Sequence, residues 1–327
     1  MKIQIAPPLY IYEQGQRPNQ EDSLWPPALA SGASSAAKKG VQAFLVCDGM
    51  GGHEHGEVAS QAVAMAIGHY LAEQTNDEEP LDDGVINDAV EEAYKRLDAL
   101  DTDSGGRKMG TTLTLLCLHR NGATMAHIGD SRIYHIRTAK GHEGILYLSR
   151  DHSLVMEMYL AGELSKGEME TYDKKNVITR AMQPHQERRS RPDIVHTTDL
   201  RGEDYFFLCS DGIMERLADA ELVSILCADM TDEEKLQKIK EATKDAGDNH
   251  TAYLIRIESV EKEPSDTYAP HDEDRSRANF LVAERCALGD IEGNTEQVTE
   301  EVCNAGRDDC PQTEESWIRR FMKSWKS

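Results

Sequence analysis

The sequence has few cysteines and no long apolar run. Its seven cysteines are an odd number without regular spacing, which argues against a disulfide framework. Cys47, Cys117 and Cys209 fall within apolar runs typical of core strands, so we interpret them as small buried residues and expect a reducing compartment. No run approaches the roughly 18 residues that span a bilayer, and residues 1–8 lack the apolar region of a secretory leader. These absences predict a cytoplasmic chain.

Positive charge is also scarce. The 327 residues include 36 Lys and Arg against 59 Asp and Glu, a formal net charge of -23. Such an excess of negative charge argues against nucleic acid or an anionic membrane as the main partner. The hydrophobic share of 39% and the charged share of 29% are ordinary for a globular protein. The length suits one large domain with a small appendage.

Apolar periodicity predicts an α+β fold. Helices are expected over residues 57–74, 84–100, 152–172, 219–228 and 231–246. Strands are expected over 3–12, 44–48, 111–118, 123–128, 131–137, 145–148, 205–209 and 251–257. Loops are expected at 26–40 and 103–110. Strand groups alternating with helix pairs favour sheets packed together and covered by helices.

The composition changes near residue 259. Residues 261–315 are acidic and polar without a clear period, so we predict a catalytic domain over 1–258 and a flexible tail over 259–327. The tail ends in Trp317–Trp325, a short basic amphipathic segment. This segment suits docking on a partner, a membrane surface or the chain's own acidic body, or it is a frayed terminal helix.

Acidic turns stand at the ends of several predicted strands. The apolar run Phe44–Cys47 ends on Asp48-Gly49, and glycine lets the backbone bend and its carbonyl approach an ion. One Asp-Gly pair usually marks only a turn. The full set is Glu21-Asp22, Asp48-Gly49, Asp130, Asp211-Gly212 and Asp248-Asn249. Converging carboxylates repel unless cations neutralise them, and oxygen ligands without a Cys/His cluster favour Mg²⁺ or Mn²⁺.

Arg17 precedes the first acidic pair by four residues. Its planar guanidinium suits two oxygens of a phosphate dianion. Two hard cations and one arginine are a combination that serves phosphoryl chemistry.

The acidic turns and Arg17 belong to a longer series of short motifs. In order, they are Arg-Pro-Asn-Gln-Glu-Asp at 17–22, Asp-Gly-Met-Gly-Gly-His at 48–53, Gly-Glu-Val-Ala-Ser at 56–60, Gly-Thr-Thr at 110–112, Ile-Gly-Asp-Ser-Arg-Ile-Tyr at 128–134, Ser-Arg-Asp-His-Ser-Leu at 149–154, Ile-Thr-Arg-Ala at 178–181, Leu-Cys-Ser-Asp-Gly at 208–212 and Asp-Asn-His-Thr at 248–251. Together they resemble the bacterial type 2C family of metal-dependent protein phosphatases. The resemblance spans roughly residues 10–257 and leaves the tail outside.

The resemblance implies a four-layer α-β-β-α sandwich that hydrolyses phosphoserine and phosphothreonine in proteins. A water bridging two divalent ions would attack phosphorus directly, without a phosphoenzyme. By motif match, Asp48 bridges the ions, Glu21 and the Gly49 carbonyl complete one site, Asp211 and Asp248 complete the other, Asp22 supports this shell, Arg17 binds the phosphate and Asp130 holds a possible third ion. The implied partners are proteins phosphorylated by a cognate kinase, and the enzyme is expected to be a monomer.

The general acid departs from the family pattern. Several members have a histidine directly after the Asp-Gly pair, where this chain has Met50. His53 and His55 are candidates for protonating the leaving group, and water on the metal is another. We interpret His152 and His250 as structural, and residues 149–182 as a flap that shapes substrate choice. Two other functions remain open: a catalytically silent scaffold that binds phosphoproteins, and a two-metal hydrolase of small phosphoesters or nucleic acid.

Overall fold

A computed structural model describes residues 1–27, 41–51, 55–75, 81–101 and 109–261. Most of the two loops predicted at 26–40 and 103–110 lies outside these residues. His53, the acidic tail beyond residue 261 and the basic segment at its end lie outside them as well.

Two antiparallel sheets form the centre of the described fold. The first has the order β1-β13-β12-β9-β10, with β2 also pairing with β13, and the second has the order β11-β8-β7-β4-β3. The first sheet contains β1 (Lys2–Ile5), β2 (Leu9–Glu13), β9 (Arg132–Arg137), β10 (Gly144–Leu148), β12 (Asp204–Cys209) and β13 (His250–Glu261). The second contains β3 (Ser23–Trp25), β4 (Gln42–Cys47), β7 (Leu113–His119), β8 (Gly122–Ile128) and β11 (Asp193–Thr197).

The sheets pack face to face through alternate side chains of their strands. Phe44 of β4 meets Tyr253 of β13 edge to face, with ring centroids 5.5 Å apart. Leu116 and Phe206 are fully buried, and they alternate along their strands with residues that face the helices. This inner layer fixes the two sheets against each other.

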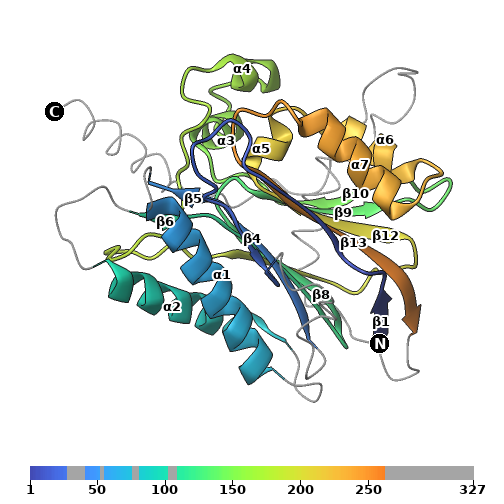
Figure 1. Ribbon diagram of the computed structural model, residues 1–327, viewed down its shortest axis with the longest axis horizontal. Helices are drawn as coiled ribbons and strands as arrows, with labels where there is room; N and C mark the ends of the chain where they lie inside the picture. The colour runs from blue at the N-terminus through green and yellow to red at the C-terminus, as the bar shows by residue number, and fades with distance from the viewer. Residues whose placement is uncertain (28–40, 52–54, 76–80, 102–108, 262–327) are drawn as a thin grey trace, which may run out of the picture. The chain divides into compact units, whose positions relative to one another are not determined.

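Helices cover both outer faces (Figure 1). Those covering the second sheet are α1 (His55–Gln74) and α2 (Asp83–Leu100), and those covering the first are α6 (Asp219–Cys227) and α7 (Asp232–Thr243). Helix α2 begins at the N-cap Asp82, and α7 begins with a capping box of Thr231 and Glu234. The predicted four-layer α-β-β-α sandwich is confirmed.

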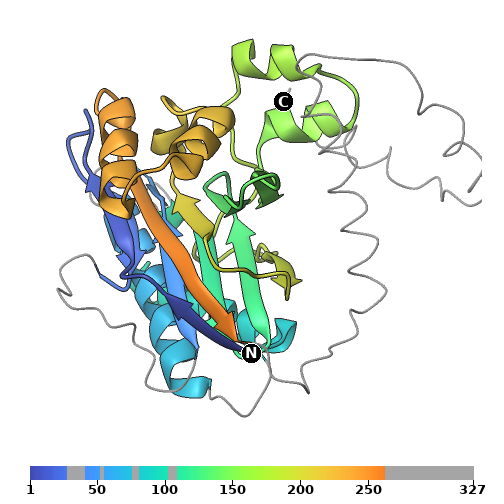
Figure 2. The same cartoon turned by 90° about the vertical axis from the view of Figure 1, so that its right-hand side faces the viewer.

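Several predicted elements differ from those observed. The strand expected over 3–12 is two strands, because Pro7 and Pro8 cannot donate to a ladder. The helix expected over 152–172 is divided into α3 (Leu154–Leu160) and α4 (Lys166–Thr171), since Gly162 takes a φ of 73° and Ser165 caps a new start. Strand β11 and the one-turn helix α5 (Asp211–Met214) were not predicted. In both views, the flap helices α3 and α4, in light green, lie beyond one end of the sheets (Figure 1, Figure 2).

Candidate active site

Strand register gathers three acidic turns at one end of the first sheet. Cys209, the last residue of β12, pairs with Ala252 near the start of β13 and with Arg132 at the start of β9. Antiparallel neighbours therefore bring one strand's end beside the starts of two others. The predicted ligands gathered in this way are Asp130, Asp211 and Asp248.

The loop between β2 and β3 brings the remaining residues to the same end. Glu13 at the end of β2 pairs with His250 at the start of β13. The loop formed by residues 14–21 therefore begins beside Asp248. Ser23 at the start of β3 pairs with Cys47 at the end of β4. This second pairing sets Glu21 and Asp22 beside Asp48, and the structure thus brings together all the predicted carboxylates.

Burial and the neighbouring negative charges raise the pKa values of the gathered carboxyl groups. Burial, reinforced by the Asp211 charge, raises the pKa of Asp130 to about 7. Burial also raises the pKa of Asp22 to about 7, and burial with the Asp248 charge raises that of Asp211 to about 6. The pKa of Asp48 lies well above its ordinary value, first through burial and then through the charge of Asp22. A bound cation would reverse each of these effects.

Several carboxylate oxygens in the cluster are available as ligands. Among the described residues, three carboxylate oxygens are buried without a hydrogen-bond partner: the Oδ1 atoms of Asp22, Asp130 and Asp211. A buried acceptor left unpaired is costly, and coordination to a cation removes the cost. Because the donors are carboxylate oxygens, the set fits a hard divalent cation such as Mg²⁺ or Mn²⁺.

The Gly-Thr-Thr motif holds the Asp48 backbone. The Thr111 hydroxyl and the Thr112 N–H both donate to the Asp48 carbonyl, each at 2.9 Å. The Asp48 N–H in turn donates to the Thr112 hydroxyl at 3.0 Å, and that hydroxyl lies 2.8 Å from the Ser131 hydroxyl. These bonds fix the direction in which the Asp48 side chain leaves β4. The motif was quoted from the sequence, but its holding role was not inferred.

Gly49 is required for space. Its φ is outside the left-handed region, so the unusual dihedral expected from the sequence is not the reason for glycine here. A Cβ at this position would lie 2.3 Å from the Gly56 carbonyl oxygen and 2.4 Å from the Glu21 carbonyl oxygen. The Gly49 N–H donates to Glu21 at 3.2 Å, and the Ser60 hydroxyl donates to the same carbonyl. Three segments thus meet on one glycine.

Ser210 holds the buried carboxylate of Asp22. Its hydroxyl donates to Asp22 Oδ2 at 2.8 Å, and it accepts the Thr251 N–H at 3.0 Å. Asp22 is 1% exposed and so lies behind the more accessible carboxylates. This position agrees with the supporting role expected for Asp22, and Ser210 is a site residue that the sequence analysis did not single out.

Arg17 and His55 lie in accessible positions. The Arg17 side chain is 54% exposed, and its guanidinium pairs with Asp248 at 2.5 Å. Hydrogen bonding to Asp248 is the main cause of its raised pKa. His55 is exposed at the first residue of α1. His53 lies outside the described residues.

A second group of possible ligands lies in the described region, at His127, His152 and Asp193. The Gly129 N–H donates to His152 Nδ1 at 3.1 Å, so the His152 proton is on Nε2, which donates to Asp193 at 3.2 Å. A metal at Nε2 would therefore require His152 to lose its only ring proton. The rings of His127 and His152 are also stacked 4.5 Å apart, so their in-plane lone pairs do not converge. We interpret the group as a tether between β8, the flap and β11, in agreement with the structural role predicted for His152.

The tether predicts an acid-sensitive contribution to stability. Burial lowers the pKa of His127 to about 4. The unfolded chain binds this proton near pH 6.5, so the contribution is complete above pH 6.5 and is lost as the pH falls towards 4. His127→Gln retains a donor for the Arg150 carbonyl. Between pH 7 and pH 5, the unfolding free energy of wild type should fall by about 2 kcal/mol more than that of this variant. Urea unfolding at both pH values measures this, and equal losses would contradict it.

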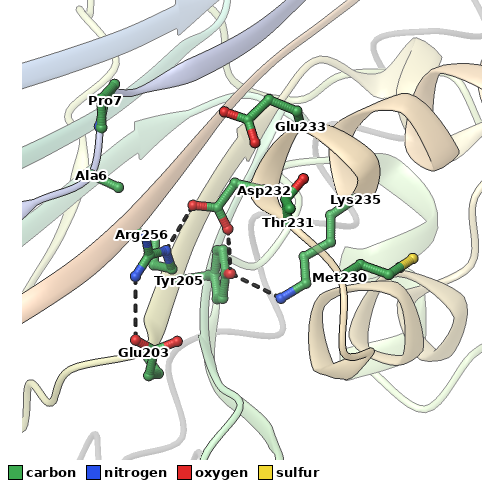
Figure 3. Close-up of a pocket in the computed structure, with 10 residues that line it drawn as sticks. All are labelled: Ala6, Pro7, Glu203, Tyr205, Met230, Thr231, Asp232, Glu233, Lys235 and Arg256. Atoms are coloured by element: carbon green, nitrogen blue, oxygen red, sulfur yellow. Dashed lines mark hydrogen bonds and ion pairs between the residues drawn. The ribbon is translucent and has the colours of Figure 1, made fainter.

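A cavity of about 350 Å³ lies at the opposite ends of β12 and β13 (Figure 3). Several of its charged groups pair with one another: Arg256 pairs with Asp232 at 2.7 Å and with Glu203 at 3.2 Å, while Tyr205 donates to Asp232 and accepts from Lys235. Tyr205 is the second residue of β12, the strand that leads to the acidic turn at its other end. The cavity is therefore separate from the carboxylate cluster.

The fold and the acidic cluster place the chain in a class of metal-dependent hydrolases, and comparison with known proteins defines its family. Residues 28–244 match the family model described as protein phosphatase 2C. The chain belongs to the protein phosphatase 2C family, which confirms the resemblance seen in its motifs. The match does not include Arg17, Glu21, Asp22 or Asp248, so their place in the cluster rests on strand register and hydrogen bonds.

Relatives and solved structures agree with this assignment. Protein phosphatase PhpP of Streptococcus pneumoniae is 32% identical over 235 residues, which are 69% of this chain and 90% of the relative. The serine/threonine phosphatase of S. agalactiae superposes with a TM-score of 0.66 and 28% identity, over 77% of this chain and 99% of its own. The catalytic domain of PstP, solved in complex with 2 manganese ions, gives a TM-score of 0.61 and 26% identity, over 78% and 99% of the chains.

No helix in the described ranges is long and apolar enough to cross a membrane.

Proposed function

We propose that this chain is a metal-dependent phosphatase that removes phosphate from phosphoserine and phosphothreonine in proteins. The observation that carries the proposal is the carboxylate cluster at one end of both sheets, with buried unpartnered oxygens and an exposed arginine at its edge. The relatives named as serine/threonine phosphatases support the substrate class.

The proposed ligands are divided between two ions. Asp48 would bridge both, Glu21 and the Gly49 carbonyl would complete one site, and Asp211 and Asp248 the other. Bound cations would supply an activated water and would withdraw charge from the phosphoryl oxygens. We propose Mn²⁺ or Mg²⁺ for these sites, and Asp130 for a third ion. The manganese bound by the PstP domain supports this choice.

The chain's own residues orient the reaction. Arg17 is exposed enough to meet a phosphate on a protein surface, and its planar fork can donate to two equatorial oxygens. The hydrogen bonds of Thr111 and Thr112 hold the Asp48 backbone, and that of Ser210 holds the Asp22 carboxylate, so that little reorganisation accompanies the reaction. Protonation of the leaving alkoxide falls to His53, His55 or water.

The other functions are not favoured. A silent scaffold would be expected to lack metal ligands, whereas all the predicted carboxylates are present and gathered at one end of the sheets. A nucleic-acid hydrolase is at odds with a net charge of -23. We propose phosphoproteins produced by a cognate kinase as substrates, a monomeric cytoplasmic enzyme, and a catalytic domain over 1–258 followed by a tail over 259–327.

Phosphate release from a phosphothreonine peptide tests the function. We expect turnover with Mn²⁺ or Mg²⁺ and its loss in EDTA, with recovery when metal is returned. p-Nitrophenyl phosphate serves as the small-ester comparison, and we expect a higher kcat/KM for the peptide. Turnover that survives EDTA would contradict the metal-dependent mechanism. Turnover of the small ester alone would favour a two-metal hydrolase of small phosphoesters.

A further inference from the structure

The side chain of Asn249 joins the loop that carries Arg17 to the start of β13. Its Nδ2 donates to the carbonyl of Gln14 at 2.8 Å and to that of Asn19 at 2.9 Å. Its Oδ1 accepts the N–H of Glu21 at 2.8 Å. Asn249 is 4% exposed, and both of its amide hydrogens and its oxygen are used. One side chain therefore binds the loop at three points, on both sides of Arg17.

Two further contacts shape the same loop. The exposed Gln14 side chain donates from Nε2 to the carbonyls of Arg17 and Pro18, both at 2.8 Å. Gly15 has a φ of 61°, and a Cβ there would lie 2.1 Å from the Asp248 carbonyl oxygen. The loop is thus packed against the Asp248-Asn249 backbone, while the Arg17 side chain stays exposed.

We propose that Asn249 is a positioning residue for phosphate binding, acting through the backbone of the loop to aim the Arg17 guanidinium. The inference rests on the proposed function. An exposed arginine on an untethered loop would lose much of its orientation, and each misplaced ångström is costly in a preorganised site. The amide fixes the loop at Gln14 and Asn19, so the short segment that carries Arg17 is held at both of its ends.

Asn249 is also next to Asp248, so an effect on metal binding must be separated from an effect on Arg17. Asp248 makes its own bond, since its Oδ1 accepts the Asn249 N–H at 2.8 Å through the backbone. A side-chain substitution at residue 249 leaves that bond in place. Inhibition by inorganic phosphate at saturating Mn²⁺ reports on the arginine, whereas the Mn²⁺ concentration for half-activation reports on the carboxylates.

The experiment is a double-mutant cycle of Asn249→Ala and Arg17→Ala in the full chain. Asn249→Ala alone should weaken inhibition by phosphate and raise the KM for a phosphothreonine peptide by about 10- to 100-fold. In the Arg17→Ala background the same change should alter phosphate inhibition by less than about threefold, because the group being aimed is gone. The half-activating Mn²⁺ concentration should stay within about threefold.

Three variants complete the design. Asn249→Asp keeps the size of the side chain but turns an acceptor towards two carbonyls, so it should match or exceed the effect of Asn249→Ala. Gln14→Ala, at an exposed position, should give a smaller shift in the same direction without unfolding the protein. Asn87→Ala removes a comparable bond, from Nδ2 to the Asp83 carbonyl on α2, and should change nothing.

Additive effects in the cycle would overturn the inference, as would an Asn249→Ala protein whose phosphate inhibition and KM match wild type. A variant that changed only the Mn²⁺ requirement would overturn it too, because Asn249 would then act on the metal ligands. Failure of the proposed function is a separate result, since it would appear as wild-type protein without metal-dependent phosphate release.

Discussion

Asp48→Asn should abolish phosphate release, with kcat/KM lower by at least about 10³-fold, since several kcal/mol of barrier lowering depend on the bound cations. Asp48 is the ligand proposed to bridge both ions, and its backbone is held by Thr111 and Thr112 in a way that the substitution leaves intact. The measurement is turnover of a phosphothreonine peptide across a range of Mn²⁺ concentrations.

The same variant should be more stable than wild type when metal is absent. The folded protein raises the pKa of Asp48, first through burial, so ionisation of this carboxyl opposes folding. Wild type therefore loses stability as the pH rises above about 4, the pKa in the unfolded chain, and the neutral amide does not. Thermal unfolding in EDTA should show the largest gain for Asp48→Asn near pH 8 and none below about pH 4.

Asp88→Asn on the exposed face of α2 is the matched control, because it removes a carboxylate outside the cluster. It should change neither turnover nor metal-free stability. Near-normal turnover by Asp48→Asn at any Mn²⁺ concentration would refute the bridging assignment. A metal-free Asp48→Asn protein less stable than wild type at pH 8 would refute the account in which burial and neighbouring charges make ionised Asp48 destabilising.

Gly49→Ala should damage both activity and stability. The new methyl group would lie within 2.4 Å of two backbone carbonyl oxygens, those of Glu21 and Gly56, and neither can turn away as a flexible side chain could. Moving the loop or the start of α1 displaces proposed ligands, which should lower kcat/KM by about 10²-fold or more. Overpacking of this kind should cost about 1–3 kcal/mol of unfolding free energy. Peptide turnover and denaturant unfolding measure the two effects.

Gly167→Ala provides the control for this substitution. Gly167 lies in α4 with nothing within 4 Å of the added carbon, so alanine should be neutral or slightly stabilising there. A Gly49→Ala protein with unchanged turnover and unfolding midpoint would show that the backbone at Gly49 yields easily. In that case the three segments that meet there would not be fixed by their packing.

Local patterns in the sequence were sufficient for most helices and strands and for the choice of carboxylates. The buried run Phe44–Cys47 and the amphipathic pattern of α2 are visible in a few consecutive residues, because side-chain periodicity reflects which face is buried. The flap was misread as one helix because its apolar residues keep a helical spacing, whereas Gly162 and Ser165 end one helix and begin another. Strand β11 was missed because its five residues, flanked by polar segments, carry little pattern.

Residue types and their order along the chain were sufficient to predict the family, the layered fold and the residues proposed to bind metal. The contacts by which these residues support one another are visible only in the folded chain. They are the hydrogen bonds of Asn249 to Gln14, Asn19 and Glu21, the crowding around Gly49, and the hydrogen bond to His152 Nδ1 that argues against a second metal site. Such relations join segments as far apart as residues 14 and 249. Strand register and sheet stacking set which groups form hydrogen bonds and which atoms pack closely. The order of residues along the chain does not specify the distances between such groups.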